Sequence, residues 1–493
     1  GSVDGGHQRV QSDIRAGADK GTRQERRDSL SERSLRQQRQ DEVATSENDN
    51  GTNAESERPV AETSARKSSG NDSAGNIVRR DTSAVHAAGR DDAGRKNAEP
   101  LETTSQKSLK ENSSTEIAGH NYHITNDSGI GEGGLKTKFK QNIDAIKLLK
   151  KLESEGRMAT PSEQKILAQF NGWGTVASVF SSDTKWDKER QQLKEILTEE
   201  EYKSASAATP NAFYTSPEIA QAIWQGLNRL GFKGGRVLDP SMGSGIFFGT
   251  MPLETAAKSE LTGVELDDLT GRIAKQLYQN AAIDIIGFQD RRLPGNYYDL
   301  AISNVPFGTI RYQNGRQIFN IHNFFFAKAM DVVRPGGLVA FITGTGTMQA
   351  GQDAAVLRAI LNSQADLIAA FKLPSQTFEK NAGTSVTSDI LILQKRLDPN
   401  TPSEYAQEWS NIEQISLETK QGDYRYQMPL DINEYFQKNP QNMIGKPIVD
   451  KLNYRARLGL DGKGREVTKE LSALMEKLPE NIYKPIEGRK TPT

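Results

Sequence analysis

Between residues 209 and 396, short apolar runs alternate with amphipathic helical patterns. The runs are RVLD, ELTGVEL, YYDLAIS, GGLVAFIT, ADLIAAFKL and SDILIL. Because this alternation is typical of strands connected by helices, it predicts a mainly parallel sheet with helices on both faces. We therefore expect an α/β, doubly wound fold for this segment. Sheets of this class bind ligands at the carboxyl ends of their strands, so the residues that follow each run are the candidates for function.

The flanking segments differ in composition and predict three further regions. Residues 1–135 are polar, with no aromatic residue before Tyr122, and are predicted to be a disordered tail because they bury too little apolar surface. Arginines and acids are interleaved there, which favours a solvated linker over a nucleic-acid-binding arm. Residues 136–208 carry apolar side chains at helical spacing and are predicted to be helical. Residues 397–493 are predicted to be a polar linker with short helices that leads to a further C-terminal part.

The helical region contains one strong start signal. Thr160, followed by Pro161 and Glu163, predicts a capped helix. Phe170 and Trp173 are expected to pack this region onto the sheet domain. An apolar stripe of this kind is typical of a core, so we assign it no chemistry.

The composition excludes several classes of protein. The chain has 493 residues, with 63 Lys and Arg against 64 Asp and Glu, so its net charge of −1 identifies no partner. It has no cysteine, which excludes a disulfide scaffold and a zinc site built on thiolates. No segment approaches the ~20 apolar residues that a membrane span needs. We expect a cytoplasmic protein with no metal and no membrane partner.

A carboxylate and a glycine-rich turn follow the first apolar run. Asp239 ends the strand, and Gly243 and Gly245 form a Gly-x-Gly turn that lets a ligand approach the backbone. Phe248 stands where the dinucleotide fingerprint has its third glycine, which counts against NAD. Glu265 ends the next run, where a carboxylate can accept hydrogen bonds from ribose hydroxyls. An acid beside the glycines suits a cationic amino-acid group, so the pattern predicts a pocket for S-adenosylmethionine.

Two neighbouring segments extend the predicted pocket. Phe288 is a candidate to cover an adenine ring, and either Gln289 or Asp290 to meet the exocyclic amine of that ring; the register leaves this choice open. Thr215 and Glu218 form a predicted capping box at the start of an amphipathic helix. The free N–H groups of that helix N-terminus would suit the carboxylate of the cofactor.

The fourth run ends in SNVPFG, a combination that suits no regular element. The side-chain oxygen of Asn304 and the backbone carbonyl of Val305 can accept two hydrogen bonds from an amino group attached to a ring. These bonds would direct the lone pair of the nitrogen toward a methyl donor. Pro306 fixes the turn, and Phe307 offers a face on which a planar base can stack. These four residues are the predicted catalytic site.

The motifs FYTSPE, DPSMGSG, GVELD and SNVPFG occur in an order that resembles one class of adenine-N6 DNA methyltransferases. In that class the carboxylate-binding segment precedes the glycine loop. More closely, residues 136–400 resemble the methylase module of very large methylase–helicase proteins of phages and conjugative elements, which are associated with protection from restriction. The stretches that carry this resemblance are NAFYTSPEIAQAIW, LDPSMGSGIFFGTMP and HNFFFAKAMDVVRPGGLVAFIT.

The resemblance implies a role for each matching residue. Thr215 would contact the carboxylate of the cofactor, Asp239 its amine and Glu265 its ribose, while the SNVPFG segment would hold the target amine. The class has Pro where this chain has Val305, so the turn is expected to be less rigid. The full set of predicted cofactor-binding residues is Phe213, Tyr214, Thr215, Asp239, Ser241, Gly243, Gly245, Glu265, Leu266, Phe288 and Gln289.

Two downstream segments are predicted to contact DNA. Residues 309–317 carry Arg311 and Arg316, which could bind phosphates beside a flipped base, although a solvated loop is the alternative. Phe378 precedes the last strand, where the related enzymes close over the target base.

We therefore expect methyl transfer from S-adenosylmethionine to N6 of adenine in DNA, with low or short sequence specificity, and protection of mobile-element DNA from restriction. The expected partners are DNA with a flipped adenine and a helicase region of the same full-length protein, in a bacterial, phage or plasmid setting. Two alternatives remain open. One is methylation of a glutamine amide in a protein, which uses a similar clamp. The other is a DNA-binding module that has lost turnover. Val305, in place of the proline of the related class, is the change that suggests this alternative.

Overall fold

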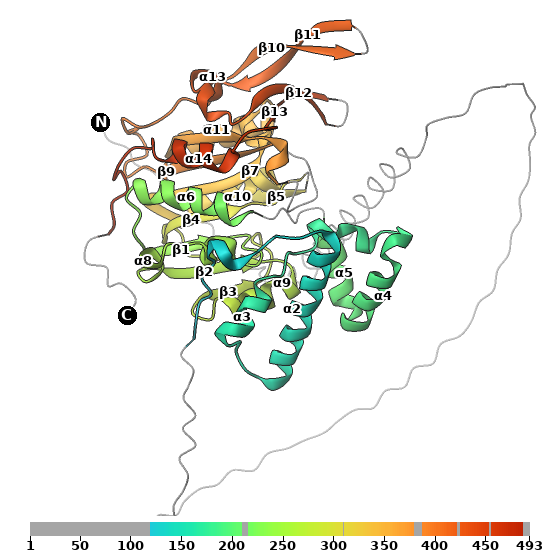
Figure 1. Ribbon diagram of the computed structural model, residues 1–493. Coiled ribbons are helices and arrows are strands. Elements are labelled where there is room, and N and C mark those ends of the chain that lie inside the picture. Colours follow the sequence, from blue (N-terminus) through green and yellow to red (C-terminus); the bar gives the residue numbers. More distant parts are fainter. Residues whose placement is uncertain are drawn as a thin grey trace, which may run out of the picture. The chain divides into compact units, whose positions relative to one another are not determined.

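The computed structural model describes residues 119–209, 215–308, 310–378, 387–421, 424–452 and 455–486 (Figure 1). All described residues belong to one compact unit. The predicted disordered tail, residues 1–135, lies outside the described residues except for 119–135. For this part the prediction is wrong, because it contains η1 and buries Ile124 and Ile130.

A sheet of seven strands, in the order β3-β2-β1-β4-β7-β9-β8, forms the centre of the described part (Figure 1). Strands β3, β2, β1, β4 and β7 are parallel, and β9 runs antiparallel to both of its neighbours. All six apolar runs of the sequence become strands, which confirms the predicted mainly parallel α/β fold. The strands are β1 (Arg236–Asp239), β2 (Glu260–Glu265), β3 (Ala282–Ile285), β4 (Tyr298–Asn304), β7 (Val333–Gly344), β8 (Ala365–Leu373) and β9 (Ser388–Lys395).

The strand order reverses between β1 and β4. The chain builds outward from β1 through β2 to β3, then returns to place β4 on the other side of β1, where Val237 pairs with Leu300 and Leu238 with Ala301. Ligands of doubly wound sheets bind in the crevice outside the carboxyl ends of the strands at such a switch point. The fold therefore brings the ends of β1, β2 and β4 to the expected ligand position.

Helices cover both faces of the sheet, and successive residues of β7 point to opposite faces. Leu338 belongs to a buried cluster that includes α6, and Val339 belongs to a second cluster that includes α10. The helices are α2 (Leu135–Glu155), α3 (Pro161–Leu167), α4 (Asp187–Ile196), α5 (Glu199–Ala208), α6 (Pro217–Arg229), α7 (Ile246–Gly249), α8 (Leu253–Ala256), α9 (Asp268–Leu277), α10 (Ile321–Val332), α11 (Gln352–Asn362), α13 (Glu434–Lys438) and α14 (Val467–Met475). The 3₁₀ helices are η1 (Asn126–Ser128), η2 (Gly174–Phe180), η3 (Thr184–Trp186), η5 (Thr345–Met348), η6 (Ser375–Thr377) and η7 (Pro440–Asn442).

The segment before the sheet is helical, as predicted. The capping box at Thr160 is present, since the Thr160 hydroxyl accepts the N–H of Glu163 and the Glu163 carboxylate accepts the N–H of Thr160 at 2.9 Å. Helices α2 and α3 pack on α9 of the sheet domain. A buried hydrogen bond joins the two parts: the Ala159 N–H donates to Gln276 of α9 at 2.8 Å.

The segment after the sheet differs from the predicted linker with short helices. Two antiparallel hairpins form there: β10 (Ile412–Gln421) with β11 (Tyr424–Asn433), and β12 (Lys446–Leu452) with β13 (Arg455–Asp461). The polar composition of these strands hides them from a search for apolar runs. Along β11, for example, exposed polar residues alternate with half-buried ones. A third hairpin, β5 (Arg311–Asn314) with β6 (Gln317–Asn320), follows β4.

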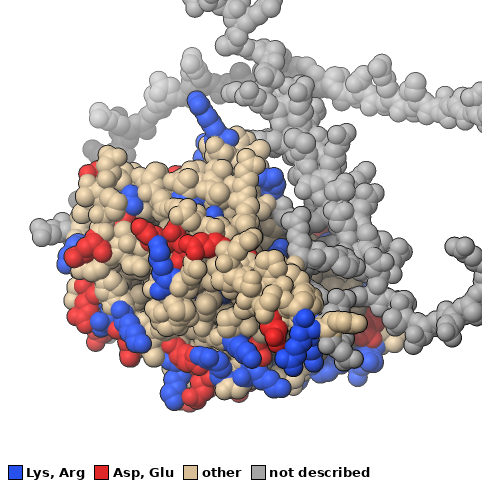
Figure 2. Space-filling model, turned by 90° about the horizontal axis from the view of Figure 1, so that it is seen from above, with Lys and Arg blue, Asp and Glu red and all other residues tan. Residues whose placement is uncertain are grey.

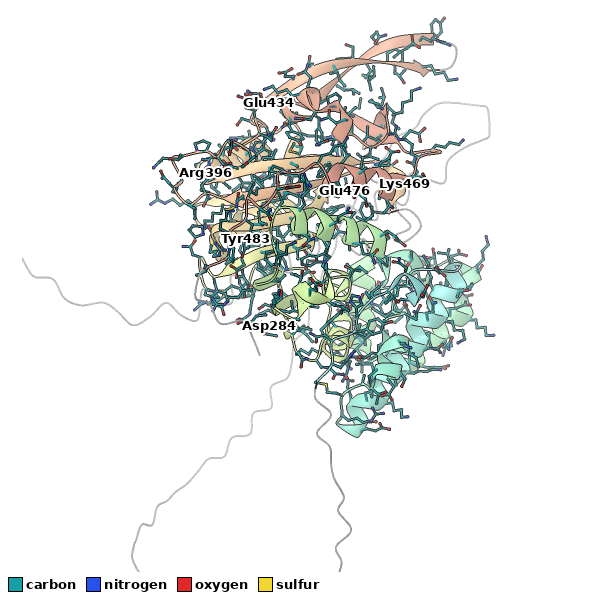
Figure 3. All side chains as sticks on the ribbon, turned by 60° about the vertical axis from the view of Figure 1, so that its left-hand side comes forward. Asp284, Arg396, Glu434, Lys469, Glu476 and Tyr483 are labelled. Carbon is teal, nitrogen blue, oxygen red and sulfur yellow. The ribbon has the colours of Figure 1, made fainter. Side chains whose placement is uncertain are left out.

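The chain then returns to the sheet domain. Helix α14 packs on α6 so closely that a Cβ at Gly226 would lie 2.6 Å from the sulfur of Met475. Farther on, Tyr483 (labelled in Figure 3) donates from its hydroxyl to the buried carboxylate of Asp299 at 3.1 Å. The residues up to Tyr483 are therefore part of the folded domain.

A buried ion pair joins the two antiparallel strands at the edge of the sheet. The Lys372 ammonium of β8 donates to Asp389 of β9 at 2.6 Å, and the side chains are 3% and 0% exposed. Removing one partner of a buried pair leaves an uncompensated charge, which typically costs about 3–5 kcal/mol. We expect Lys372→Met to destabilise the protein by that amount in urea unfolding. The double variant Lys372→Met/Asp389→Leu should recover most of the loss, and equal stability of the two variants would contradict this reading.

The face of the molecule shown in Figure 2 carries charges of both signs. Lys and Arg are interspersed with Asp and Glu on the face shown in Figure 2, and neither sign dominates it. Within the described ranges, no helix is both long and apolar enough to cross a membrane.

Candidate functional site

A cavity of about 310 Å³ opens at the carboxyl ends of the central strands. Its volume lies at the lower end of the range of roughly 300–1,000 Å³ that small-molecule sites occupy. The cavity brings together segments that the sequence analysis had predicted, one by one, to bind the cofactor or the target amine. Among its lining residues are Ser241 and Gly243 of the glycine loop, Glu265 and Leu266 after β2, Phe288 and Gln289 after β3, and Asn304 and Pro306 after β4.

Asp239 ends β1 and is completely buried behind the glycine loop. Its Oδ1 accepts a hydrogen bond from the Ser303 hydroxyl at 2.7 Å and from the Ser241 N–H at 3.2 Å. Its Oδ2 is buried and has no hydrogen-bond partner within the part of the chain that the structure describes. Burial raises the pKa of Asp239 to about 7, with a further contribution from Glu265, while the two hydrogen bonds oppose the rise.

Glu265 ends β2 and holds two loops by their backbones. Its Oε2 accepts the Gly243 N–H and its Oε1 the Asp267 N–H, both at 2.8 Å. Burial raises the pKa of Glu265 to about 7 as well, despite these bonds. Each carboxylate oxygen can accept more than one hydrogen bond, so the predicted ribose contact is compatible with this arrangement. The structure adds a second role, the positioning of the glycine loop.

The two glycines of the loop serve different purposes. Gly243 lines the cavity, has a φ of +55°, and has no atom within 4 Å of the position that a Cβ would take. Gly245 does not line the cavity, and a Cβ there would lie 2.1 Å from the ring of Tyr278. The structure therefore shows a packing role for Gly245, where the loop comes close to Tyr278 at the end of α9.

The end of β3 closes one side of the cavity. Phe288 is buried and packs on Phe325 of α10, with ring centroids 4.9 Å apart, and both rings line the cavity. The Lys328 ammonium donates to the backbone carbonyls of Phe288, Gln289 and Arg291 and so fixes this turn. Leu266 is 70% exposed and lines the cavity, as the prediction for it requires.

The predicted capping residue of α6 is wrong by one position. The Ser216 hydroxyl, and not that of Thr215, accepts the capping bond, from the N–H of Ile219. Thr215 is buried and accepts a hydrogen bond from the side-chain amide of Asn304 at 3.0 Å. Phe213 and Tyr214 lie outside the described residues.

The SNVPFG segment leaves the sheet at the edge of the cavity. Asn304 and Pro306 line it, while Val305 is buried in the cluster below. The Val305 N–H donates to the Ile342 carbonyl at 3.0 Å and so extends the pairing of β4 with β7 by one residue. The turn thus has a backbone anchor that proline could not provide. Phe307 is half-buried beside Gly344.

The predicted DNA contacts fall into two groups. Arg311 and Arg316 belong to the β5–β6 hairpin and are exposed, and Arg311 also lies 3.6 Å from Asp353. Residues 311–320 thus form a hairpin, and its exposed arginines are compatible both with a phosphate contact and with the solvated alternative. Phe378 is 2% exposed and packed in the core, so stacking on a base would require it to leave that core. Residues 379–386, which follow it, lie outside the described residues.

The helical region contributes residues to the cavity that the sequence analysis did not assign. They are Phe170, Asn171, Gly172 and Trp173 before η2, and Ser204, Ala207 and Ala208 of α5. The Ser204 hydroxyl also donates to Asp267 at 2.8 Å. A signal was present, since Asn-Gly between two aromatic residues indicates a turn rather than a helix interior. In the described part of the chain, no group of three or more His, Asp or Glu is placed to hold a metal ion.

Comparison with known proteins agrees with the resemblance found in the motifs. No known family model matches the chain. Defense against restriction protein B of Escherichia phage P1 is 26% identical over 276 residues, a match that covers 54% of this chain. The chain spans only 11% of the length of that relative.

Solved structures with a similar fold include two methyltransferases. One is a proposed class I S-adenosylmethionine-dependent methyltransferase of Listeria monocytogenes, with 16% identity, a TM-score of 0.35, and coverage of 55% of this chain and 91% of that one. The other is a methyltransferase subunit of a type I restriction-modification system of Streptococcus thermophilus, with 13% identity, a TM-score of 0.34, and coverage of 54% and 80%.

Proposed function

We propose that this protein transfers a methyl group from S-adenosylmethionine to N6 of adenine in DNA. The observation that carries the proposal is the single cavity that joins Glu265 and the glycine loop to Asn304 and Pro306. A donor bound by the first set and an amine held by the second would meet at the switch point of the sheet.

The donor side fits the cofactor on the chemistry of its residues. The buried oxygen of Asp239 that lacks a partner suits a cation, and the α-ammonium of S-adenosylmethionine is one. The absence of a third loop glycine, with Phe248 in its place, is unsuited to a pyrophosphate. Leu266 and Phe288 offer apolar surfaces for the adenine ring of the cofactor.

The acceptor side fits an amine conjugated to a ring. When bound, the cofactor supplies an activated methyl group on a sulfonium. The side-chain oxygen of Asn304 and the backbone carbonyl of Val305 accept hydrogen bonds from the two N–H groups of the target amine. These hydrogen bonds localise the lone pair of the nitrogen. That lone pair forms the new N–C bond as the S–CH₃ bond breaks and its electrons remain on sulfur. The amine becomes acidic only after methylation, and the amide oxygen of Asn304 can then pass its proton to water.

The test is methyl transfer from tritiated S-adenosylmethionine to unmodified DNA, followed by nucleoside chromatography. N6-methyladenine supports the proposal. A product on a protein glutamine would show that the substrate is a protein rather than DNA, and it would leave the proposed role of the SNVPFG segment unchanged. Cofactor binding without any product on DNA or protein would favour the module without turnover.

The resemblance to a phage protein named for defence against restriction supports a role for this activity in protecting mobile-element DNA. Such protection requires methylation at many sites, which agrees with low sequence specificity. Digestion of the methylated DNA with restriction enzymes sensitive to adenine methylation would measure both properties.

Cofactor affinity is expected to depend on pH. Because burial raises the pKa of Asp239 to about 7, the free protein holds a proton there below neutrality. The ammonium of the cofactor needs the ionised form, so binding releases that proton. We expect the affinity for S-adenosylhomocysteine to fall as the pH decreases below about 7, by up to roughly tenfold per unit, and to level off above it in calorimetric titration.

The hydrogen bond from Ser303 provides a control for this assignment. It lowers the pKa of Asp239, so Ser303→Ala should move the midpoint of the pH dependence upward. An affinity that is the same from pH 5.5 to 8 would contradict the contact between Asp239 and the ammonium.

A further inference from the structure

The turn of residues 170–173 in the helical region places two polar atoms without partners beside the cofactor cavity. Asn171 and Trp173 both line the cavity and are 4% and 1% exposed. The side-chain oxygen of Asn171 and the indole N–H of Trp173 are buried and make no hydrogen bond to any residue in the described ranges. Leaving such groups unpaired is costly, so a buried donor and a buried acceptor beside one cavity call for an explanation.

The surrounding contacts hold these two residues in a fixed arrangement. The Asn142 side chain, fully buried on α2, accepts the N–H of Asn171 and donates to the carbonyl of Gly172, both at 2.7 Å. Gly172 has a φ of +68°, which favours glycine at this position. The Trp173 ring packs edge-on against Phe170 and Phe180. The turn is therefore held in place by contacts with the helical region.

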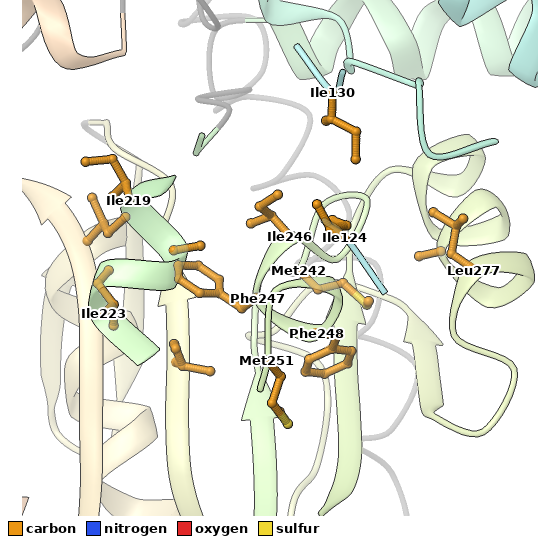
Figure 4. Close-up of a cluster of buried hydrophobic side chains, with 14 of the residues drawn as sticks. Ile124, Ile130, Ile219, Ile223, Met242, Ile246, Phe247, Phe248, Met251 and Leu277 are labelled. Carbon is orange, nitrogen blue, oxygen red and sulfur yellow. The ribbon is translucent and has the colours of Figure 1, made fainter. Parts of the chain in front are cut away.

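The turn shares the cavity with the glycine loop, because Asn171 and Trp173 line it together with Ser241, Gly243 and Ser244. Gln169 donates to the Ser128 carbonyl at 2.8 Å, which ties the turn to the segment of η1. Ile130, two residues after Ser128, and Ile246, the first residue after the glycine loop, belong to one buried cluster (Figure 4). The glycine loop is proposed to face the methionine end of the cofactor, and the turn lines the same cavity.

A free α-amino acid group matches what the turn offers. Its ammonium donates hydrogen bonds, as the Asn171 oxygen requires, and its carboxylate accepts them, as the Trp173 N–H requires. We infer that Asn171 and Trp173 bind the amino-acid end of S-adenosylmethionine, so that the helical region supplies part of the cofactor site. This inference rests on the proposed function, because it takes S-adenosylmethionine as the ligand of the cavity.

The test compares two ligands that differ in that end. S-adenosylhomocysteine carries the α-amino acid group, whereas 5′-methylthioadenosine lacks it and keeps the adenosine. Trp173→Phe removes the indole N–H and keeps an aromatic ring between Phe170 and Phe180. We expect it to weaken S-adenosylhomocysteine by roughly tenfold to 100-fold, the effect of one hydrogen bond to a charged group, and to leave 5′-methylthioadenosine unchanged. Asn171→Ala should act in the same direction.

Trp409→Phe is the matched control. Trp409 is as deeply buried, but its N–H donates to Asn362 beside β8 and it does not line the cavity. It should leave both affinities unchanged, and melting temperatures would show that each variant is folded. Unchanged binding of both ligands to Trp173→Phe, or an equal loss with both, would overturn the inference. A wild-type protein that binds neither ligand would instead overturn the proposed cofactor, which separates the two failures.

Discussion

Asn304→Ala is expected to lower the rate of methyl transfer by more than about 100-fold, as the loss of one preorganised polar contact to a transition state does. Cofactor affinity should stay nearly unchanged, because Asn304 acts on the target amine. The structure gives the reason for its effectiveness. The NH₂ end of the Asn304 amide donates to Thr215 at 3.0 Å, so the oxygen end of the same amide is turned away from Thr215.

Thr215 therefore provides a second, finer test of the same geometry. Thr215→Val removes the hydroxyl and keeps the shape, so the amide loses the bond that orients it; Thr215→Ser keeps that bond. We expect the first variant to be slow and the second to be close to wild type in tritiated methyl transfer. The resemblance gives Thr215 a different role, contact with the cofactor carboxylate. Weaker binding of S-adenosylhomocysteine to Thr215→Val would support that role, and a wild-type rate for Asn304→Ala would defeat the clamp.

The sheet could be predicted from the sequence because its strands are buried on both faces. Such strands are apolar at successive positions, as in ADLIAAFKL, so they can be recognised from a short stretch of sequence alone. Once the strands are placed, the carboxyl-end rule brings Asp239, Glu265 and Asn304 to one edge without any knowledge of distances. The structure puts Glu265 and Asn304 on one cavity, whereas Asp239 is fully buried, does not line the cavity, and accepts the N–H of the lining residue Ser241.

What the sequence could not show depends on residues far apart in the chain. The Gly-x-Gly pattern does not reveal that Gly243 faces a cavity while Gly245 makes room for the ring of Tyr278. Likewise, the sequence suggests that Val305 makes the turn less rigid than the proline found at this position in the related class. The Ile342 carbonyl that accepts its N–H comes from another strand. Val305→Pro should therefore cost stability through that lost bond rather than improve the turn.

Asp239→Asn should lower the affinity for the cofactor without lowering the stability of the protein. The neutral amide can still accept from Ser303 and Ser241, so the loop keeps its geometry. The negative charge that would attract the ammonium is gone. We expect the affinity for S-adenosylhomocysteine to fall by roughly 10- to 100-fold, equivalent to about 1.5–3 kcal/mol. The loss should be smaller with 5′-methylthioadenosine, and the pH dependence near 7 should weaken, leaving the part that comes from Glu265, whose pKa is also raised to about 7. Asp284→Asn, at a half-buried carboxylate of β3 that pairs with Arg291 and lies outside the cavity, should change none of these.

The stability of the same variant should change in the opposite direction. The pKa of Asp239 is raised from 3.8 to about 7 by burial, so the folded protein disfavours the ionised form. The contribution of Asp239 to the stability of the ligand-free wild-type protein therefore decreases as the pH rises from about 4 to 7, because folding then competes with ionisation. Asp239→Asn carries no such cost and should melt at a higher temperature than wild type at pH 8, with a smaller difference at pH 4. A variant that loses cofactor and also melts lower at pH 8 would show that Asp239 stabilises the fold instead of being held ready for a cation.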